Sequence, residues 1–245
     1  MKKILVSIFG VFAVFQFVPA AEIVGGSNIL TSANASQLET WLGEGPITIT
    51  RIFTLVPGER DVPYQFHHAV DGKGRTFSVI QALSSSGDAS DPENRSILSD
   101  QIIGGYDPQS WDSNSGARFT PNIKDQTAFL FDLTSKVKLA QGGAVKVQTY
   151  NSSYTGINFG GHSLVTNYNF SYGSAYGDWA ANGWAYGPGL PALGGGSGEG
   201  ANYDEFGIGN LEVFTIADTV KPVAPAPAAL LVFALGVVAR RKRKS

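Results

Sequence analysis

The chain has 245 residues, and 43% of them are hydrophobic against 16% charged, as in a globular protein. It has no cysteine and its only methionine is Met1, which excludes disulfide-stapled scaffolds and thiol enzymes. Residues 1–20 and 228–245 hold seven of the 18 basic residues and none of the 20 acidic ones. The body between them therefore has 11 basic against 20 acidic residues, a net charge of −9, which disfavours nucleic acid as a partner.

The N-terminus is predicted to be a secretory signal peptide that covers residues 1–20. The basic pair Lys2-Lys3 precedes the apolar run Ile4–Val18, and Val18-Pro19-Ala20 supplies small residues for signal peptidase. A basic, an apolar and a small-residue region in this order are typical of export signals. The mature chain would then begin at Ala21, and the alternative is an uncleaved membrane anchor.

The C-terminus has the three parts of a sorting signal. A proline-rich spacer, residues 217–227, leads into the apolar segment 228–239, and the chain ends in a basic cluster that includes Arg240 and Arg241. Such a cluster is expected to remain in the cytoplasm, which places the body on the other side of the membrane. We assign residues 228–245 to this signal.

The spacer and tail together resemble the PEP-CTERM signal of Gram-negative bacteria. That family usually has Pro-Glu-Pro, where this chain has Pro225-Ala226-Pro227. The resemblance implies processing by an exosortase-like enzyme. The alternative is a permanent transmembrane helix, because the apolar stretch Val223–Ala239 is near the lower limit of about 17 residues for spanning a bilayer.

The first half of the body is predicted to alternate short helices and strands. A helix is expected over Asn34–Leu42, with Asn34 as its N-cap and Gly43 ending it. Alternating side chains favour a strand over Ile47–Leu55, and a short helix over Pro63–Val70 has proline in its first turn. A strand over Thr76–Leu83 and a polar loop over Ser84–Asn94 follow.

The centre of the chain, residues 101–133, is predicted to form two strands around an aromatic turn. An apolar strand begins at Ile102 and meets the pair Gly104-Gly105, which suits a bend or bulge where no side chain fits. Pro108 indicates a turn, and Thr127–Leu133 reads as a strand buried on both faces.

Further strands are predicted over Ala144–Tyr150, Ser163–Asn169 and Phe206–Ile216. The stretch Tyr172–Glu199 between them is rich in Gly, Trp and Tyr and is less regular. Many short strands with glycine-rich turns and few helices favour a mostly β (α+β) domain built as an antiparallel sandwich.

Five segments, in this order, resemble the motifs of the TLDc domain, the module of eukaryotic oxidation-resistance proteins. The segments are Leu38–Leu42 with Arg51–Phe53, Phe66–His68 with Gly72–Phe77, Gly104–Trp111 with Phe129–Leu133, Asn158–Leu164, and Asn210–Phe214. The resemblance covers residues 37–216, with residues 21–36 as a short lead. It implies two antiparallel sheets packed as a sandwich with short flanking helices.

Histidines and acids give weak signals for catalysis or metal binding. His68 with His162 and a carboxylate would make a metal or hydrolase site only if the fold brings them together, and satisfied structural histidines are the alternative. Three acids in the predicted polar loop, Asp88, Asp91 and Glu93, lack the spacing of a calcium loop. Glu212, in an apolar strand, is a candidate acid or an outward-facing residue. We predict no cofactor, metal site or catalytic residue.

Aromatic residues of the glycine-rich stretch are the candidate ligand-binding residues. Trp179, Trp184 and Tyr186 lie there with Tyr176, close to amide and carboxylate side chains. Exposed rings of this kind would stack on sugars, whereas buried ones would fill the open end of the sandwich.

These observations predict an exported protein that is periplasmic, on the cell surface or extracellular, transiently or permanently membrane-anchored. We expect a non-enzymatic structural or interaction module of the bacterial envelope or extracellular matrix. The alternatives are a glycan-binding module, with extracellular polysaccharide as partner, and a hydrolase. The intracellular roles of eukaryotic TLDc proteins are not carried over to an exported chain.

Overall fold

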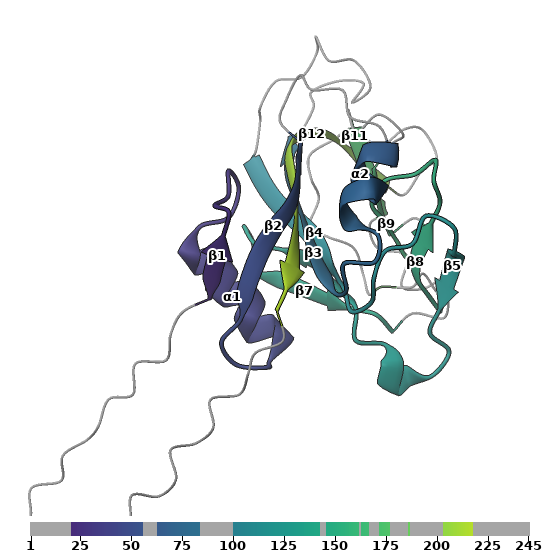
Figure 1. Cartoon of the computed structure of the whole chain (residues 1–245), viewed down its shortest axis with the longest axis horizontal. Helices are drawn as coiled ribbons and strands as arrows, with labels where there is room; N and C mark the ends of the chain where they lie inside the picture. Colours follow the sequence, from purple (N-terminus) through teal and green to yellow (C-terminus); the bar gives the residue numbers. More distant parts are fainter. Residues whose placement is uncertain are drawn as a thin grey trace, which may run out of the picture.

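The computed structural model describes residues 21–55, 63–83, 100–142, 146–161, 163–166, 172–176, 186 and 203–217 (Figure 1). The described helices and strands are β1 (Glu22–Val24), α1 (Ser32–Leu42), β2 (Thr48–Leu55), α2 (Pro63–Val70), β3 (Thr76–Leu83), β4 (Asp100–Asp107), β5 (Gly116–Phe119), the 3₁₀ turn η2 (Ile123–Asp125), β6 (Phe129–Asp132), β7 (Val137–Ala140), β8 (Val147–Asn151), β9 (Asn158–Phe159), β10 (Leu164–Thr166), β11 (Tyr172–Tyr176) and β12 (Tyr203–Ile216). The predicted mostly β class with short helices is confirmed.

The strands form two layers that share the long strand β12. One layer has the order β1-β2-β12-β3-β4-β6-β7, and the other has the order β5-β8-β9-β10-β11. The first half of β12 pairs with β11 and its second half lies between β2 and β3, so hydrogen bonding passes from one layer to the other. All the described pairs are antiparallel except β1–β2.

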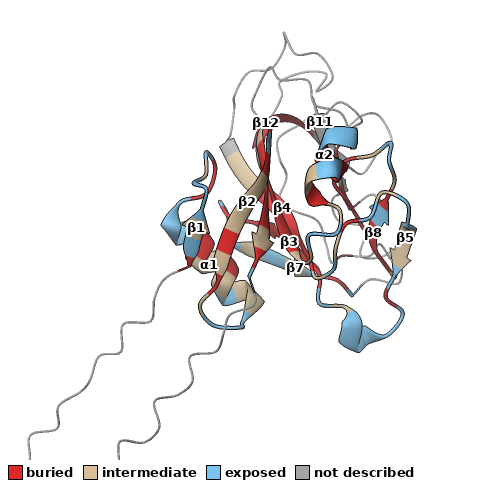
Figure 2. Cartoon of the chain, in the orientation of Figure 1, coloured by how far each residue is buried: buried red, intermediate tan, exposed pale blue. Residues whose placement is uncertain are grey.

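Two separate apolar clusters hold these layers together. The first lies between the layers and includes Phe66 of α2, Phe159 of β9 and Val213 of β12. The second lies on the other face of β3, β4 and β12, under α1, and includes Leu38 and Phe131. Figure 2 shows the buried residues concentrated in the central strands, with exposed residues on the outer side of α2. Alternate residues of one strand therefore serve two cores, as the two-residue period of a strand requires.

Because Gly104 and Gly105 lack side chains, residues of both apolar clusters can pack closely against β4. A Cβ added at Gly104 would lie 2.0 Å from the Ser78 carbonyl oxygen and 2.6 Å from Phe131, and one at Gly105 would lie 2.5 Å from Phe159. The predicted bend or bulge at this pair is wrong, because β4 passes through it in unbroken register with β3 and β6. The glycines serve close packing on both faces.

Helix α1 begins earlier than its sequence pattern indicates. Its N-cap is Thr31, whose side chain accepts a hydrogen bond from the backbone of Asn34, so the predicted N-cap at Asn34 is wrong. The predicted end is confirmed, because Gly43 adopts φ 75° and its N–H donates to the Glu39 carbonyl. The bounds of α2 and β3 agree with the predicted ranges.

The segment that leads into α1 packs as part of the domain. Strand β1 pairs with β2, and a loop that follows it is held by Glu212 of β12, which is fully buried. The Glu212 carboxylate accepts hydrogen bonds from the Ser27 hydroxyl, from the Asn28 N–H at 2.8 Å and from Arg51 at 2.9 Å. The alternative of an outward-facing Glu212 is wrong, because its side chain is buried and accepts hydrogen bonds from residues about 185 positions away in the sequence.

Residues near both ends of the described chain bond to the start of β2. The Glu22 N–H donates to the Ile47 carbonyl and the Ala217 N–H donates to the Thr48 carbonyl, both at 3.0 Å. Glu22 and Ala217 are therefore both anchored at the same end of β2.

Gly105→Ala is expected to lower the free energy of unfolding by about 1–3 kcal/mol, because the new methyl group overlaps the Phe159 ring. Urea unfolding measures this change. Gly142→Ala is the matched control, since a Cβ there meets no atom within 4 Å. An equal effect of the two substitutions would contradict the packing role of Gly105.

Candidate functional site

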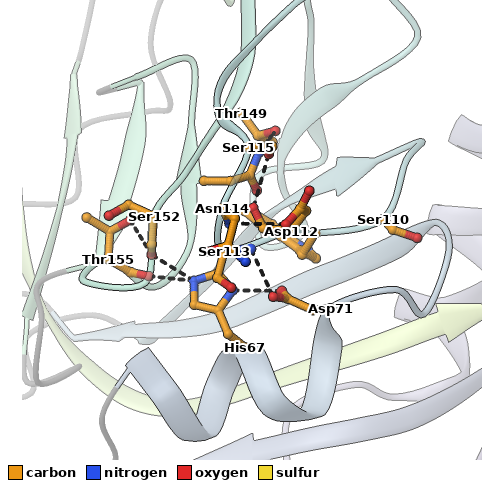
Figure 3. A network of polar contacts seen from close by, with 12 residues as sticks. His67, Asp71, Ser110, Asp112, Ser113, Asn114, Ser115, Thr149, Ser152 and Thr155 are labelled. Carbon is orange, nitrogen blue, oxygen red and sulfur yellow. Dashed lines mark hydrogen bonds and ion pairs between the residues drawn. The ribbon is translucent and has the colours of Figure 1, made fainter.

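The candidate site lies at the C-terminal end of α2, around the buried His67 (Figure 3). Its Nδ1 is 2.7 Å from the Asp71 carboxylate, one helical turn further along the chain. Its Nε2 is 3.0 Å from the Ser152 carbonyl oxygen and 2.9 Å from that of Thr155. His67 therefore joins α2 to the loop that follows β8.

Oxygen atoms lie at both nitrogens of the His67 ring. A carboxylate lies at Nδ1 and two backbone carbonyls lie at Nε2, so a ring N–H on either side has an oxygen to which it can donate. His67 is 5% exposed and Asp71 is 27% exposed, so the pair is partly shielded from water.

The second oxygen of Asp71 holds a neighbouring loop, residues 111–115. It accepts a hydrogen bond from the Ser113 N–H at 2.9 Å, and the Gly72 N–H donates to the Trp111 carbonyl at 3.1 Å. Within the loop, Asp112 accepts from the backbone of Asn114. One histidine–aspartate pair thus positions two loops from different parts of the chain (Figure 3).

A polar groove of about 650 Å³ lies beside this network and is called the polar groove below. Asp71, Gln109, Asp112, Asn114 and Arg118 line it, together with Gly72, Ser110 and Trp111. Carboxylate, amide and guanidinium groups supply donors and acceptors in one place. Trp111 offers no stacking surface there, because its side chain is fully buried and its indole N–H donates to Thr76.

The buried carboxylate of Asp107 ties the groove to both layers of the fold. It accepts hydrogen bonds from the Gln109 N–H at 3.0 Å and from the Gln148 amide at 2.6 Å, and Arg118 lies 3.4 Å away. Arg118 also donates to the Ser110 carbonyl. Burial raises the pKa of Asp107 to about 6, although the bond from Gln109, the charge of Arg118 and the bond from Gln148 oppose this shift.

The polar side chains of the site are largely engaged within the protein. Both nitrogens of His67 are engaged with oxygen acceptors, so neither is placed to take a proton from a nucleophile. Among the described residues, no three His, Cys, Asp or Glu side chains come together as a metal site. The groove offers hydrogen-bonding groups on rigid elements, as a ligand site requires.

The model of the TLDc domain matches residues 23–217. The chain belongs to the TLDc family. No curated protein matches the sequence. The match covers the whole region that the structure describes as strands and helices except the first residue of β1, so both apolar clusters and the polar groove are parts of the TLDc domain. Within the described ranges of the chain, no helix has the length and apolar character needed to cross a membrane.

Of the three predicted ligand-binding aromatics, Tyr186 lies among the described residues of the TLDc domain. Tyr186 is 2% exposed, packs edge-on against Phe159 and donates a hydrogen bond to the Gln148 carbonyl at 2.8 Å. Burial raises its pKa well above the ordinary range. Trp179 and Trp184 lie outside the described residues. Tyr186 therefore belongs to the core, the alternative that the sequence left open for these rings.

The structure describes one of the two remaining histidines. His68 is exposed on α2, and its neighbour His67 makes the polar contacts. His162, the acids Asp88, Asp91 and Glu93, and the sorting-signal residues Pro225, Pro227, Arg240 and Arg241 lie outside the described residues.

The His67–Asp71 pair was missed although its spacing is visible in the sequence. Residues four apart on a helix meet on one face. Asp71 follows the last residue of α2, and its N–H still donates to the His67 carbonyl at 2.9 Å. A histidine one turn before a C-terminal aspartate is the signal that would have found the pair.

His67→Gln is expected to lower the free energy of unfolding by about 1–3 kcal/mol, because a charge-assisted pair and two loop contacts are lost. His68→Gln on the same helix is the matched control and should change stability by less than about 0.5 kcal/mol, since that side chain is exposed. Urea unfolding of both variants makes the comparison. Similar losses of stability in both variants would show that His67 does not hold the two loops.

Asp107→Asn is expected to change how stability depends on pH. The folded chain holds the Asp107 proton more tightly than the unfolded chain, so stability falls as pH rises from 3.8 to about 6. Relative to the variant, the native chain should lose on the order of 3 kcal/mol across this window. Denaturant unfolding at several pH values measures the difference. The control Asp112→Asn, at an exposed carboxyl, should show the same dependence of stability on pH as the native chain. The same dependence for Asp107→Asn would contradict the prediction.

Proposed function

We propose that this TLDc protein is an exported, non-enzymatic interaction module of the bacterial envelope or extracellular matrix. Residues 1–20 direct export, and residues 228–245 act as a PEP-CTERM-like sorting signal for an exosortase-like enzyme. The protein then acts in the periplasm, on the cell surface or outside the cell. A permanent C-terminal anchor is the alternative form of the same proposal.

The position of the described domain between the two predicted signals supports this proposal. Glu22 and Ala217 hydrogen-bond to Ile47 and Thr48, so the described part of the domain begins after one predicted signal and ends before the other. The TLDc match also ends at residue 217, where the proline-rich spacer begins. Removal of both signals would therefore cost the domain none of its described strands, as expected for processed ends.

The candidate site supports binding as the activity. His67 and Asp71 are occupied in holding loops, and the polar groove presents Asp112 and Asn114 on one of those loops. An acidic body with a net charge of −9 suits a soluble surface that repels nucleic acid and other polyanions. These features favour an uncharged or cationic partner.

Intact mass of the protein purified from its own host, in cell-bound and medium fractions, tests the proposal. Loss of residues 1–20 and cleavage near Pro227 are expected. Replacement of the five basic residues from Arg240 to Lys244 by serine should leave the signal peptide cleaved but block processing of the C-terminus. An intact chain that retains residues 1–20 and remains in the cytoplasm would overturn the proposal. A mature chain that retains residues 228–245 would support the permanent anchor.

A further inference from the structure

A second cavity lies between the end of α1 and strands β6 and β7, beside Tyr106 and Phe129 of the second apolar cluster. It has a volume of about 360 Å³ and is called the aromatic pocket below. Trp41, Glu44, Tyr106, Gln126, Phe129 and Lys138 line it with four smaller or aliphatic residues. It shares no lining residue with the polar groove.

Aromatic rings form one wall of this pocket. Trp41 is half-buried, and its ring centroid lies 6.1 Å from that of Phe131. Tyr106 and Phe129 pack against each other at 5.1 Å and are almost fully buried. Trp41 packs against the second apolar cluster and also lines the pocket, so its ring is supported on one side and suits stacking against the C–H face of a sugar ring.

Gln126 supplies an acceptor that the fold leaves vacant. Its Nε2 donates to the Thr120 carbonyl at 2.8 Å, which fixes the orientation of the amide. Its Oε1 is buried and has no hydrogen-bond partner among the described residues. A buried acceptor without a donor costs about 1–3 kcal/mol, so a ligand hydroxyl that reaches Oε1 after a small opening of the pocket wall, and donates to it, would gain affinity.

The charged groups of the pocket already have partners within the protein. Both Glu44 oxygens accept from Arg75, at 2.7 and 2.6 Å. The Lys138 ammonium donates to the Trp41 carbonyl at 2.6 Å and lies 4.3 Å from the centroid of the Phe129 ring. Burial also lowers the pKa of Lys138. The pocket thus presents no uncompensated charge, and this favours a neutral ligand.

We propose that the aromatic pocket binds a neutral saccharide, with one sugar face against Trp41 and a hydroxyl donating to Gln126 Oε1. The pocket volume accommodates about one or two sugar rings, in the range of small-ligand sites. This inference rests on the proposed function and names the class of ligand that an exported interaction module would meet in a polysaccharide matrix. It places the site on different residues from the Trp179, Trp184 and Tyr186 set predicted from the sequence.

Titration calorimetry of the full-length chain, purified in detergent, tests the site. The probes are the tetrasaccharides of β-1,4-glucose and β-1,4-N-acetylglucosamine, with tetragalacturonate as the acidic probe of equal length. At least one neutral probe should bind with a Kd on the order of 1 mM or tighter, and tetragalacturonate should bind about tenfold more weakly. Absence of neutral binding, or a preference for the acidic probe, would overturn the proposal.

Gln126→Leu should weaken binding of the neutral probe about tenfold, the effect of losing one hydrogen bond. Gln65→Leu is the matched control, because this glutamine is exposed on α2 and lines neither cavity, and it should leave binding unchanged. Trp41→Phe keeps an apolar ring and is expected to weaken binding while the chain stays folded. A loss caused by Gln65→Leu and not by Gln126→Leu would overturn the site.

The outcomes separate this proposal from the proposed function. Calorimetry reports on the pocket wherever the protein resides, and the mass and fraction of the chain report on export whatever it binds. A processed, exported chain without saccharide affinity would contradict only the proposal of a saccharide-binding pocket. A cytoplasmic chain that binds the probe would contradict only the proposed exported role.

Discussion

The fold depends on the absence of side chains at two successive residues of β4. Gly104 faces Phe131 and Gly105 faces Phe159, so the strand is approached closely by an aromatic ring from each side. Each ring belongs to a different apolar cluster, and the distance between the two clusters is therefore only the thickness of one strand. Because interiors pack as densely as organic crystals, neither ring has space to yield to an added methyl group. Both layers and both helices pack around this pair of glycines.

Acidic side chains determine how the less regular segments attach to that frame. Asp107 links the end of β4 to β5 and β8, Glu212 holds the loop after β1, and Asp71 with His67 holds the loops beside α2. Apolar packing alone would tolerate small shifts of these segments, whereas a carboxylate with several donors accepts only one arrangement. The polar groove depends on these acids, because its lining residues belong to segments that the acids hold in place.

Local patterns in the sequence predicted the elements more completely than the sites. Proline at the start of α2 and glycine after α1 mark positions where backbone geometry leaves few choices, and the structure agrees there. The Gly104–Gly105 pair indicated that side chains were excluded, but the strand partners that exclude them are distant in sequence. Thr31 replaced Asn34 as the N-cap because both types suit that position and local pattern does not choose between them.

The candidate sites could not be predicted because their residues meet only through tertiary structure. Gln126 and Trp41 are far apart in the chain, and their common pocket exists only after α1 packs across β6. Tyr186 shows the opposite case, since a ring in a glycine-rich stretch has the composition of a binding loop but is buried beside Phe159. Burial, which distinguishes a ligand platform from a core residue, depends on segments that composition does not place.

The position of the C-terminus determines how the domain would carry a mechanical load. Strand β12 ends at Ile216 and lies between β2 and β3, so a pull on Ala217 acts along a strand bonded on both sides. Such a force loads many backbone hydrogen bonds together in shear, whereas the three-residue β1 at the other end of the chain pairs only with β2. If the domain is attached through its C-terminus, a pulling force acts first on β12, which is hydrogen-bonded on both sides. The force then loads these bonds together and does not first separate an edge strand from the sheet.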